Sequence, residues 1–302
     1  MPEENGVTTL EKVKLFTLLG DYPNTSALKS GELRSEIVDF SFADIKVANT
    51  GFKPLVREHK FDLSELAIVT YLQAKTYDKP YVLVPAVVLA RGQHHTIAYN
   101  PERGLLKPEQ LAGKRVGVRA YTVTTGVWVR GILAEQYGVD LGKVNWVTFE
   151  DPHLAEYSDP DFIERAPTGK NIAQMLLDGE LDAAIVGDKM PDPRLKHLIP
   201  DHETAAKVWA DKHGYPVNHL IVIRSELSRT RPDVVREVFR LLKESRDAAV
   251  RAGNKNAADL QFGIEPIRRS LETIIDLAVA QKLITRRFTV DELFDDTTRA
   301  LT

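Results

Sequence analysis

The chain has 302 residues, 40 of them lysine or arginine and 43 aspartate or glutamate, which gives a formal net charge of -3. A balanced charge without blocks of like sign argues against nucleic acid or a membrane surface as a partner and favours a small soluble ligand. The absence of cysteine excludes disulfides, thiolate metal sites and a cysteine nucleophile. The length predicts two lobes, because one domain typically takes about 100 to 200 residues.

The first six residues, MPEENG, are acidic and lack the basic start and apolar core of a secretory signal. No apolar run approaches the roughly 18 residues that a membrane helix needs. A cytoplasmic location is therefore expected. The sequence does not fix the oligomeric state, and a homo-oligomer is one outcome that it allows.

The first hundred residues alternate between strand and helix patterns. Strands are predicted at 13–19, 39–45 and 81–90, and helices at 24–31 and 52–58. The strand at 81–90 is almost wholly apolar, which is typical of a central strand covered on both faces. Tyr22 and Asn24 follow the first strand and could face a ligand there. Asp62 or Ser64 could cap a further helix toward Lys75, and a cap alone is the simpler interpretation of either residue.

Two adjacent histidines lie in RGQHHTIAYN, residues 91–100. On a strand His94 and His95 would point to opposite faces, so only one would easily reach a given pocket and joint metal ligation is not expected. A lone histidine is more often structural than catalytic. Its ordinary pKa near 6.5 nevertheless makes it a candidate proton donor.

The most informative stretch is GKRVGVRAYTVTTGVWVRG at 113–131. Alternating valines predict a strand at 115–120, and three threonines follow where a helix beginning near Val123 would need caps. The free amides of that first turn would attract a carboxylate or a phosphate. An ordinary capped helix is the alternative, and this stretch by itself supports both equally.

Strand patterns recur at 144–149, 181–188 and 219–224, and helical spacing at 123–137, 171–177, 232–251 and 266–282. The βαβαβ part of this alternation, which ends at residue 188, predicts a largely parallel sheet with right-handed crossovers and with ligands beyond the carboxyl ends of its strands. The polar, proline-containing segment 151–170 is predicted to be an irregular surface loop.

The C-terminal helices have too few strands around them to form a sheet domain of their own. We therefore predict a discontinuous lobe I, residues 1–100 plus 216–302, and an inserted lobe II, residues 101–215. Two chain crossings between the lobes would form a hinge with a ligand cleft beside it.

Several motifs resemble known proteins. LAGKRVGV at 111–118 and MLLDGELDAA at 175–184 resemble the type 2 periplasmic-binding-protein fold, an α/β fold in which two lobes close on a small ligand. FDLSEL with the later Tyr71, HHTIAYN, TTGVWVRGIL and HLIVIR together resemble the 4,5-dihydroxyphthalate decarboxylase family over roughly residues 13–245. The resemblance implies a two-lobed type 2 periplasmic-binding-protein-like fold with a ligand cleft between the lobes, and a lyase of phthalate breakdown.

The chain departs from the family pattern at four positions. Gln93 and His95 flank the histidine where the family has arginine and serine, and Arg119 and Ala120 stand where it has proline and glutamate. A carboxylate is lost and a guanidinium gained in the expected cleft. These changes bear on the substrate more than on the fold.

The implied reaction is the cofactor-independent decarboxylation of a hydroxylated aromatic acid like 4,5-dihydroxyphthalate, which yields a hydroxybenzoate and carbon dioxide. A hydroxyl para to the carboxylate pushes electrons to the ring carbon that an acid protonates, so no step requires a metal. His94 matches the family's histidine and is the expected acid, with Asp188 and His219 as second choices. The expected substrate-binding residues are Arg91, Arg119, Tyr121, Thr122, Thr124 and Thr125 for the carboxylate, and Asp62, Ser64 and Glu65 for the hydroxyls.

The alternative is a non-catalytic solute-binding protein that delivers a small organic anion to a transporter or a sensor. Its ligand would use the same helix ends and hinge, so the sequence geometry does not separate the two functions. The lack of a secretory signal favours the enzyme.

Overall fold

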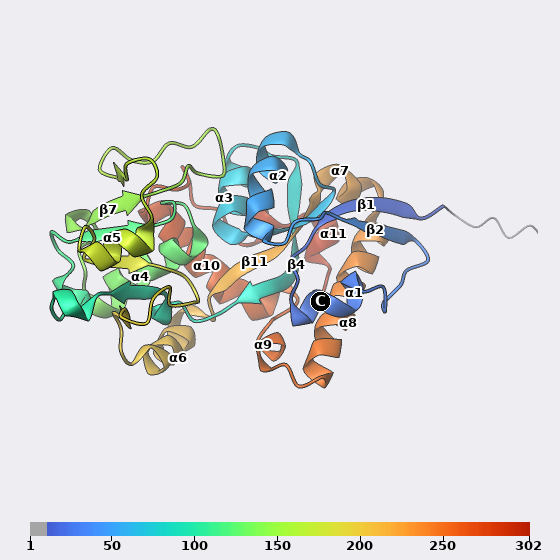
Figure 1. The fold of residues 1–302 in the computed structure, drawn as a ribbon. Coiled ribbons are helices and arrows are strands. Elements are labelled where there is room, and N and C mark those ends of the chain that lie inside the picture. Colours follow the sequence, from blue (N-terminus) through green and yellow to red (C-terminus); the bar gives the residue numbers. More distant parts are fainter. Residues whose placement is uncertain (1–10) are drawn as a thin grey trace, which may run out of the picture.

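The computed structural model describes residues 11–302, and the acidic residues 1–6, on which the expected location rests, lie outside this range. Two α/β halves lie side by side, each built around one mixed sheet (Figure 1). One sheet has the strand order β2-β1-β3-β11-β4 and the other the order β10-β5-β9-β6-β7-β8. In the described part of the chain, no helix is both long and apolar enough to cross a membrane.

The five-stranded sheet consists of β1 (Val13–Leu18), β2 (Val38–Phe42), β3 (Leu63–Ala67), β4 (Tyr81–Ala90) and β11 (Val217–Arg224). β1 runs parallel to β2 and β3, whereas β11 runs antiparallel to β3 and β4. Four of the five strands therefore run in the same direction, and β11 is the exception to the parallel order. The reason is that β11 returns from the other half of the molecule and enters the sheet between two strands that run the opposite way.

Helices cover both faces of this sheet. They are α1 (Pro23–Lys29), α2 (Phe52–Glu58), α3 (Ile68–Thr76), α7 (Ser225–Thr230), α8 (Pro232–Arg251), α9 (Lys255–Ala258) and α11 (Asp296–Arg299). The apolar stripe of α8 packs with Leu15, Val84 and Ile223 of the sheet in one core cluster. Segment 63–67, where a helix was expected to start, is a strand because all its residues are buried between β1 and β11.

The six-stranded sheet consists of β5 (Ile97–Tyr99), β6 (Arg115–Val118), β7 (Asn145–Thr148), β8 (Glu164–Arg165), β9 (Ala183–Ile185) and β10 (Lys196–His197). Its helices are α4 (Thr124–Tyr137), α5 (Ile172–Asp178) and α6 (His202–His213). β6 is parallel to β7 and β9, and β5 is antiparallel to β9 and β10. The expected strand-turn-helix at 113–131 is thus present as β6 and α4.

Short 3-10 helices connect these elements: η1 (Ala48–Gly51), η2 (His94–Thr96), η3 (Pro101–Arg103), η4 (Pro108–Gln110), η5 (Leu141–Lys143) and η6 (Asp291–Leu293). The histidine pair lies on η2 and not on a strand. The strand-based argument for its two orientations is therefore wrong, because the chain turns there before it enters β5.

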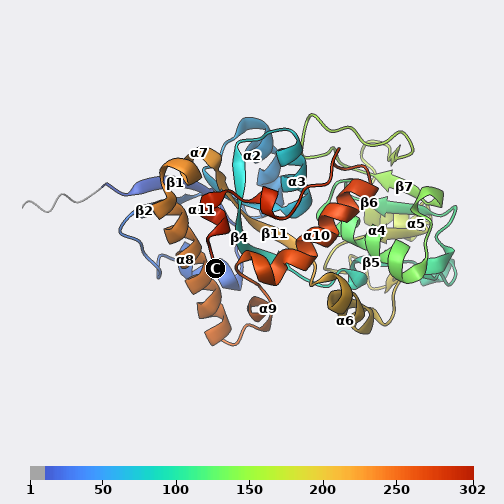
Figure 2. The same cartoon turned by 180° about the vertical axis from the view of Figure 1, so that it is seen from behind.

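The chain passes between the halves after β4 and before β11, and the long helix α10 (Ile264–Ala280) contacts both α3 and α4 (Figure 2). The predicted lobe boundaries remain a prediction. The strand β5, which lies within the range assigned to lobe I, hydrogen-bonds in the six-stranded sheet.

Candidate active site

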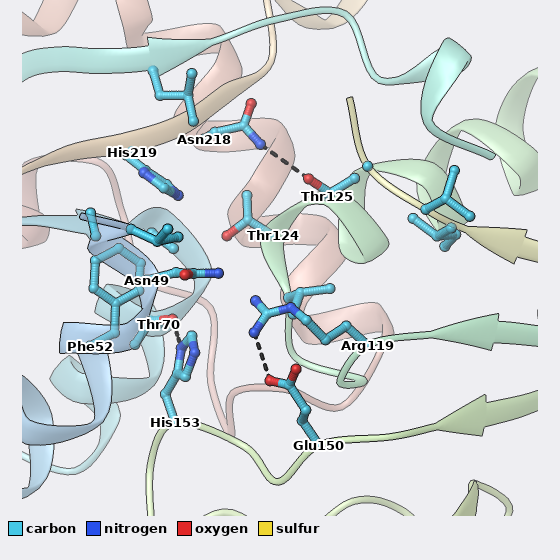
Figure 3. A pocket seen from close by; sticks show the side chains of 18 of the residues that line it. Asn49, Phe52, Thr70, Arg119, Thr124, Thr125, Glu150, His153, Asn218 and His219 are labelled. Atoms are coloured by element: carbon cyan, nitrogen blue, oxygen red, sulfur yellow. Dashed lines mark hydrogen bonds and ion pairs between the residues drawn. The ribbon is translucent and has the colours of Figure 1, made fainter. Parts of the chain in front are cut away.

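A cavity of about 590 Å³ lies between the two halves. Its walls come from the ends of β4, β6, β7 and β11, from the first turns of α4 and α5, and from η1 and α2. Most of the side chains that line it are shown in Figure 3. Its polar lining residues are Tyr22, Asn49, Thr70, Arg91, Arg119, Thr124, Thr125, Glu150, His153, Lys170, Asn171, Asn218 and His219.

A buried carboxylate and an imidazole form a hydrogen-bonded pair at this cavity. Glu65 is fully buried on β3, and its Oε1 accepts a hydrogen bond of 2.7 Å from Nδ1 of His219 on the neighbouring strand β11. The same carboxylate accepts from the Tyr22 hydroxyl at 2.8 Å and from the Gly20 amide at 2.6 Å. Because a carboxylate only accepts, Nδ1 carries a proton and the other ring nitrogen of His219 is left for the cavity.

Tyr22 supports this pair as a neutral donor. Burial raises the pKa of its phenol, and the negative charge of Glu65 raises it further. The phenol therefore stays protonated and keeps its hydrogen bond to Glu65.

The first turn of α4 faces the cavity from the opposite half. The helix begins at Thr124, as the sequence predicts, but no side chain caps it at Val123. The hydroxyl of Thr124 instead accepts from the Val69 amide at 3.2 Å, and that of Thr125 accepts from Asn218 at 3.4 Å. Amides without a side-chain cap and the positive end of the helix dipole make this turn a site for a carboxylate.

Each cationic side chain of the cavity has an acidic neighbour. Nη1 of Arg119 donates to Glu150 at 2.7 Å, and both residues line the cavity. Nη1 of Arg91 lies 3.5 Å from Asp188, which also accepts from His95 at 3.0 Å. An incoming anion would therefore compete with carboxylates for both guanidinium groups.

Asp188 is unsuited to donate a proton. Burial alone would raise its pKa, but the hydrogen bond from His95 and the charge of Arg91 outweigh burial and lower it. A carboxyl group with a lowered pKa is ionised at neutral pH. Asp188 follows the cavity-lining Gly187 in the chain and forms an ion pair with Arg91.

His94, the expected acid, does not reach the cavity. The ring is buried beneath α4 and α6, its Nε2 donates to Gln136 at 2.6 Å, and it meets Trp209 edge-on. Burial lowers the pKa of His94. The proton on Nε2 is used in this hydrogen bond inside the protein, so in this structure His94 has no donor directed at the cavity.

Four other expected residues also lie away from the cavity. Asp62 accepts from Arg224 at 2.9 Å and from the Phe16 amide, and the buried Ser64 hydroxyl donates to a backbone carbonyl. Tyr121 and Thr122 are buried, with the Arg130 guanidinium 4.0 Å from the Tyr121 ring centroid. The turn between β6 and α4 is held in the core because Arg130 donates to the Tyr121 carbonyl and Gln281 donates to the Val127 carbonyl in α4.

His219, Arg91, Arg119, Thr124 and Thr125 are the expected residues that the cavity brings together, with Glu65 directly behind His219. Sequence reasoning passed over His153, Thr70, Asn49 and Asn218. His153 lies in segment 151–170, whose polar composition predicts only a surface loop. In residues 11–302, no three histidine, aspartate or glutamate side chains are grouped so as to hold a metal ion.

No protein-family model matches the chain. The chain is 28% identical over 256 residues to a 4,5-dihydroxyphthalate decarboxylase from Comamonas testosteroni, which covers 80% of this chain and 77% of that protein. It is 29% identical over 214 residues to a 4,5-dihydroxyphthalate decarboxylase from Pseudomonas putida, which covers 66% of this chain and 82% of that protein. This chain is similar in sequence to 4,5-dihydroxyphthalate decarboxylases. The resemblance that the sequence motifs predict is confirmed.

Solved structures show the fold of this chain. The periplasmic aliphatic sulphonate binding protein SsuA from Escherichia coli aligns with a TM-score of 0.60 at 10% identity, over 94% of this chain and 98% of that chain. The desulfurization enzyme DSZB aligns with a TM-score of 0.52 at 13% identity, over 95% of this chain and 98% of that chain. The predicted two-lobed periplasmic-binding-protein-like fold is confirmed, and at these identities the likeness concerns the fold alone.

Proposed function

We propose that this protein removes a carboxylate from a hydroxylated aromatic acid like 4,5-dihydroxyphthalate and releases carbon dioxide and a hydroxybenzoate. The observation that carries the proposal is the His219–Glu65 pair on one wall of a cavity whose other wall presents the first turn of α4. The names of the two curated relatives support the reaction type.

The substrate carboxylate binds at the first turn of α4, within reach of Arg119. Backbone amides at a helix start and a guanidinium are the groups that proteins use for this purpose. Arg119 gives up part of its contact with Glu150 when the anion binds. This arrangement leaves the aromatic ring between the α4 side and the His219 side of the cavity.

His219 supplies the proton. In its doubly protonated form, His219 gives the proton on its cavity-facing nitrogen to the aromatic carbon that bears the carboxylate, and a C–H bond forms. The bond from that carbon to the carboxylate then breaks, its electron pair restores the aromatic ring, and carbon dioxide leaves. Glu65 holds the imidazole in place and stabilises its positive charge before the transfer, and solvent returns the proton afterwards.

A solute-binding protein for a small anion would use the same cavity, and the fold is compatible with that function. The decarboxylase relatives favour the enzyme because they are similar in sequence, whereas SsuA shares the fold at 10% identity. Binding without turnover is therefore the outcome that would support the alternative.

The test is carbon dioxide release from 4,5-dihydroxyphthalate, with phthalate as the substrate that lacks the hydroxyls. We expect release from 4,5-dihydroxyphthalate and none from phthalate. His202→Asn is the control variant, since His202 starts α6 and does not line the cavity. Tight binding of 4,5-dihydroxyphthalate without any carbon dioxide would contradict the proposal and favour a solute-binding protein.

A further inference from the structure

The side chain of His153 comes from the six-stranded half but is fixed by the five-stranded half. The backbone carbonyl oxygen of His153 accepts a hydrogen bond from Nε of Arg57 at 2.7 Å. The backbone carbonyl of Pro152 accepts one from the same guanidinium at 2.8 Å. The ring lies edge-on to Phe52 with the centroids 5.6 Å apart. His153 is therefore a rigid part of the cavity wall, although it stands in a loop without regular secondary structure.

The hydrogen bond to Thr70 decides how the ring presents itself. Nδ1 of His153 lies 2.8 Å from Oγ1 of Thr70, and within residues 11–302 this is the only hydrogen bond in which the Thr70 hydroxyl takes part. A buried hydroxyl needs an acceptor, and Nδ1 is the one within reach, so we assign Thr70 as the donor and the ring proton to Nε2. Figure 3 shows the ring between Thr70 and the guanidinium of Arg119 at the cavity.

The surroundings keep this ring neutral. Burial, and then the charges of Arg119, Lys53, His219 and Arg57, lower the pKa of His153 to about 3. A second proton on the ring is therefore disfavoured across the physiological range. A neutral imidazole at the cavity wall can donate a hydrogen bond from its N–H group to an oxygen of a ligand. The same ring is a poor base, because its pKa is low.

We propose that His153 binds a ring hydroxyl oxygen of the substrate through Nε2–H, and that it makes the cavity prefer hydroxylated aromatic acids to the same acids without the hydroxyl. This inference rests on the proposed function, because it takes the carboxylate to lie at the first turn of α4. The two contacts together would orient the ring across the cavity, with His219 beside the carbon to be protonated. His153 is thus a specificity residue and not the acid.

Binding of 4-hydroxybenzoate and benzoate by calorimetry tests the inference without any turnover. The ratio of the two dissociation constants in the parent measures the contribution of the hydroxyl. We expect His153→Leu to reduce this ratio about tenfold, the effect of losing one hydrogen bond, with benzoate binding changed less than about threefold. His153→Gln retains an N–H donor at a similar reach and should keep most of the preference.

Thr70→Val is the second variant, and it should also reduce the preference because Nδ1 loses its partner. Equal loss of affinity for both acids in His153→Leu would show a structural role and overturn the inference, as would an unchanged ratio or a parent that binds neither acid. The ratio is independent of carbon dioxide release. If His153→Leu reduces the ratio of dissociation constants but the parent releases no carbon dioxide, the proposed reaction is contradicted and this inference is still supported.

Discussion

Nδ1 of His219 lies 2.7 Å from Oε1 of Glu65, on adjacent antiparallel strands that belong to segments 154 residues apart in the sequence. The carboxylate has no exposure to solvent, and three donors satisfy it. A buried charge of this kind is costly unless it is fully hydrogen-bonded. The pairing therefore fixes the imidazole at the cavity wall more firmly than packing alone would.

We expect His219→Asn to reduce the turnover number for 4,5-dihydroxyphthalate about 100- to 10,000-fold, as is typical when a general acid is removed. His94→Asn should retain turnover within about tenfold and lower the unfolding temperature, because His94 is buried against Gln136 and Trp209. Steady-state kinetics and thermal unfolding of both variants separate the two effects. The reverse pattern would restore His94 as the acid.

We expect Glu65→Gln to lower the turnover number with little change in the Michaelis constant, since Glu65 acts through His219 and does not line the cavity. The NH₂ group of the glutamine would also face one of the donors that now bind the carboxylate. A buried donor left without an acceptor lowers the stability of the protein by about 1–3 kcal/mol. Tyr22→Phe removes one of three hydrogen bonds and should have a smaller effect on both turnover and stability. A large rise in the Michaelis constant alone for Glu65→Gln would contradict this role.

Arg119 and Glu150 should influence anion binding in opposite directions. Arg119→Gln should weaken 4-hydroxybenzoate binding about 10- to 150-fold, the range expected for a lost charged hydrogen bond. Glu150→Gln should tighten binding, because it releases the guanidinium from its present partner at 2.7 Å. Arg165→Gln is a matched control, since this arginine pairs with Asp151 and does not line the cavity. Weaker binding in both Arg119→Gln and Glu150→Gln would argue against a carboxylate beside Arg119.

The stability of the protein should fall on acidification partly because of His153. Its pKa is lowered from 6.5 to about 3 in the folded protein by burial and the cations around it. Between these pH values the unfolded chain binds a proton that the folded chain does not, so unfolding becomes easier as the pH falls. One such group contributes at most about 1.4 kcal/mol per pH unit.

Chemical unfolding at about pH 7 and about pH 5 measures this contribution. The parent should lose up to about 2 kcal/mol more stability between these conditions than His153→Gln, which has no imidazole to protonate. An equal loss in the two proteins would show that His153 is free to take up a proton in the folded state.

Much of the fold follows from local pattern. The apolar run at β4 and the strand-turn-helix of β6 and α4 lie where the sequence predicts them, because continuous burial and helical spacing leave a direct trace in residue order. The strand β3 was missed because burial on both faces removes the alternation by which a strand is recognised. The antiparallel entry of β11 was missed because strand direction depends on how the chain returns from the other half.

For the site, the sequence determined the start of α4. The reaction implied by the family resemblance indicated Arg91 and Arg119 as carboxylate ligands and His219 as a second choice for the acid. Only the tertiary structure separates the histidines by their position relative to the cavity. A 3-10 turn carries His94 under α6, while the pairing of β11 with β3 brings His219 onto Glu65. His153 reaches the cavity because Arg57 and Thr70, far away in sequence, hold its loop there, and no local pattern encodes such a contact.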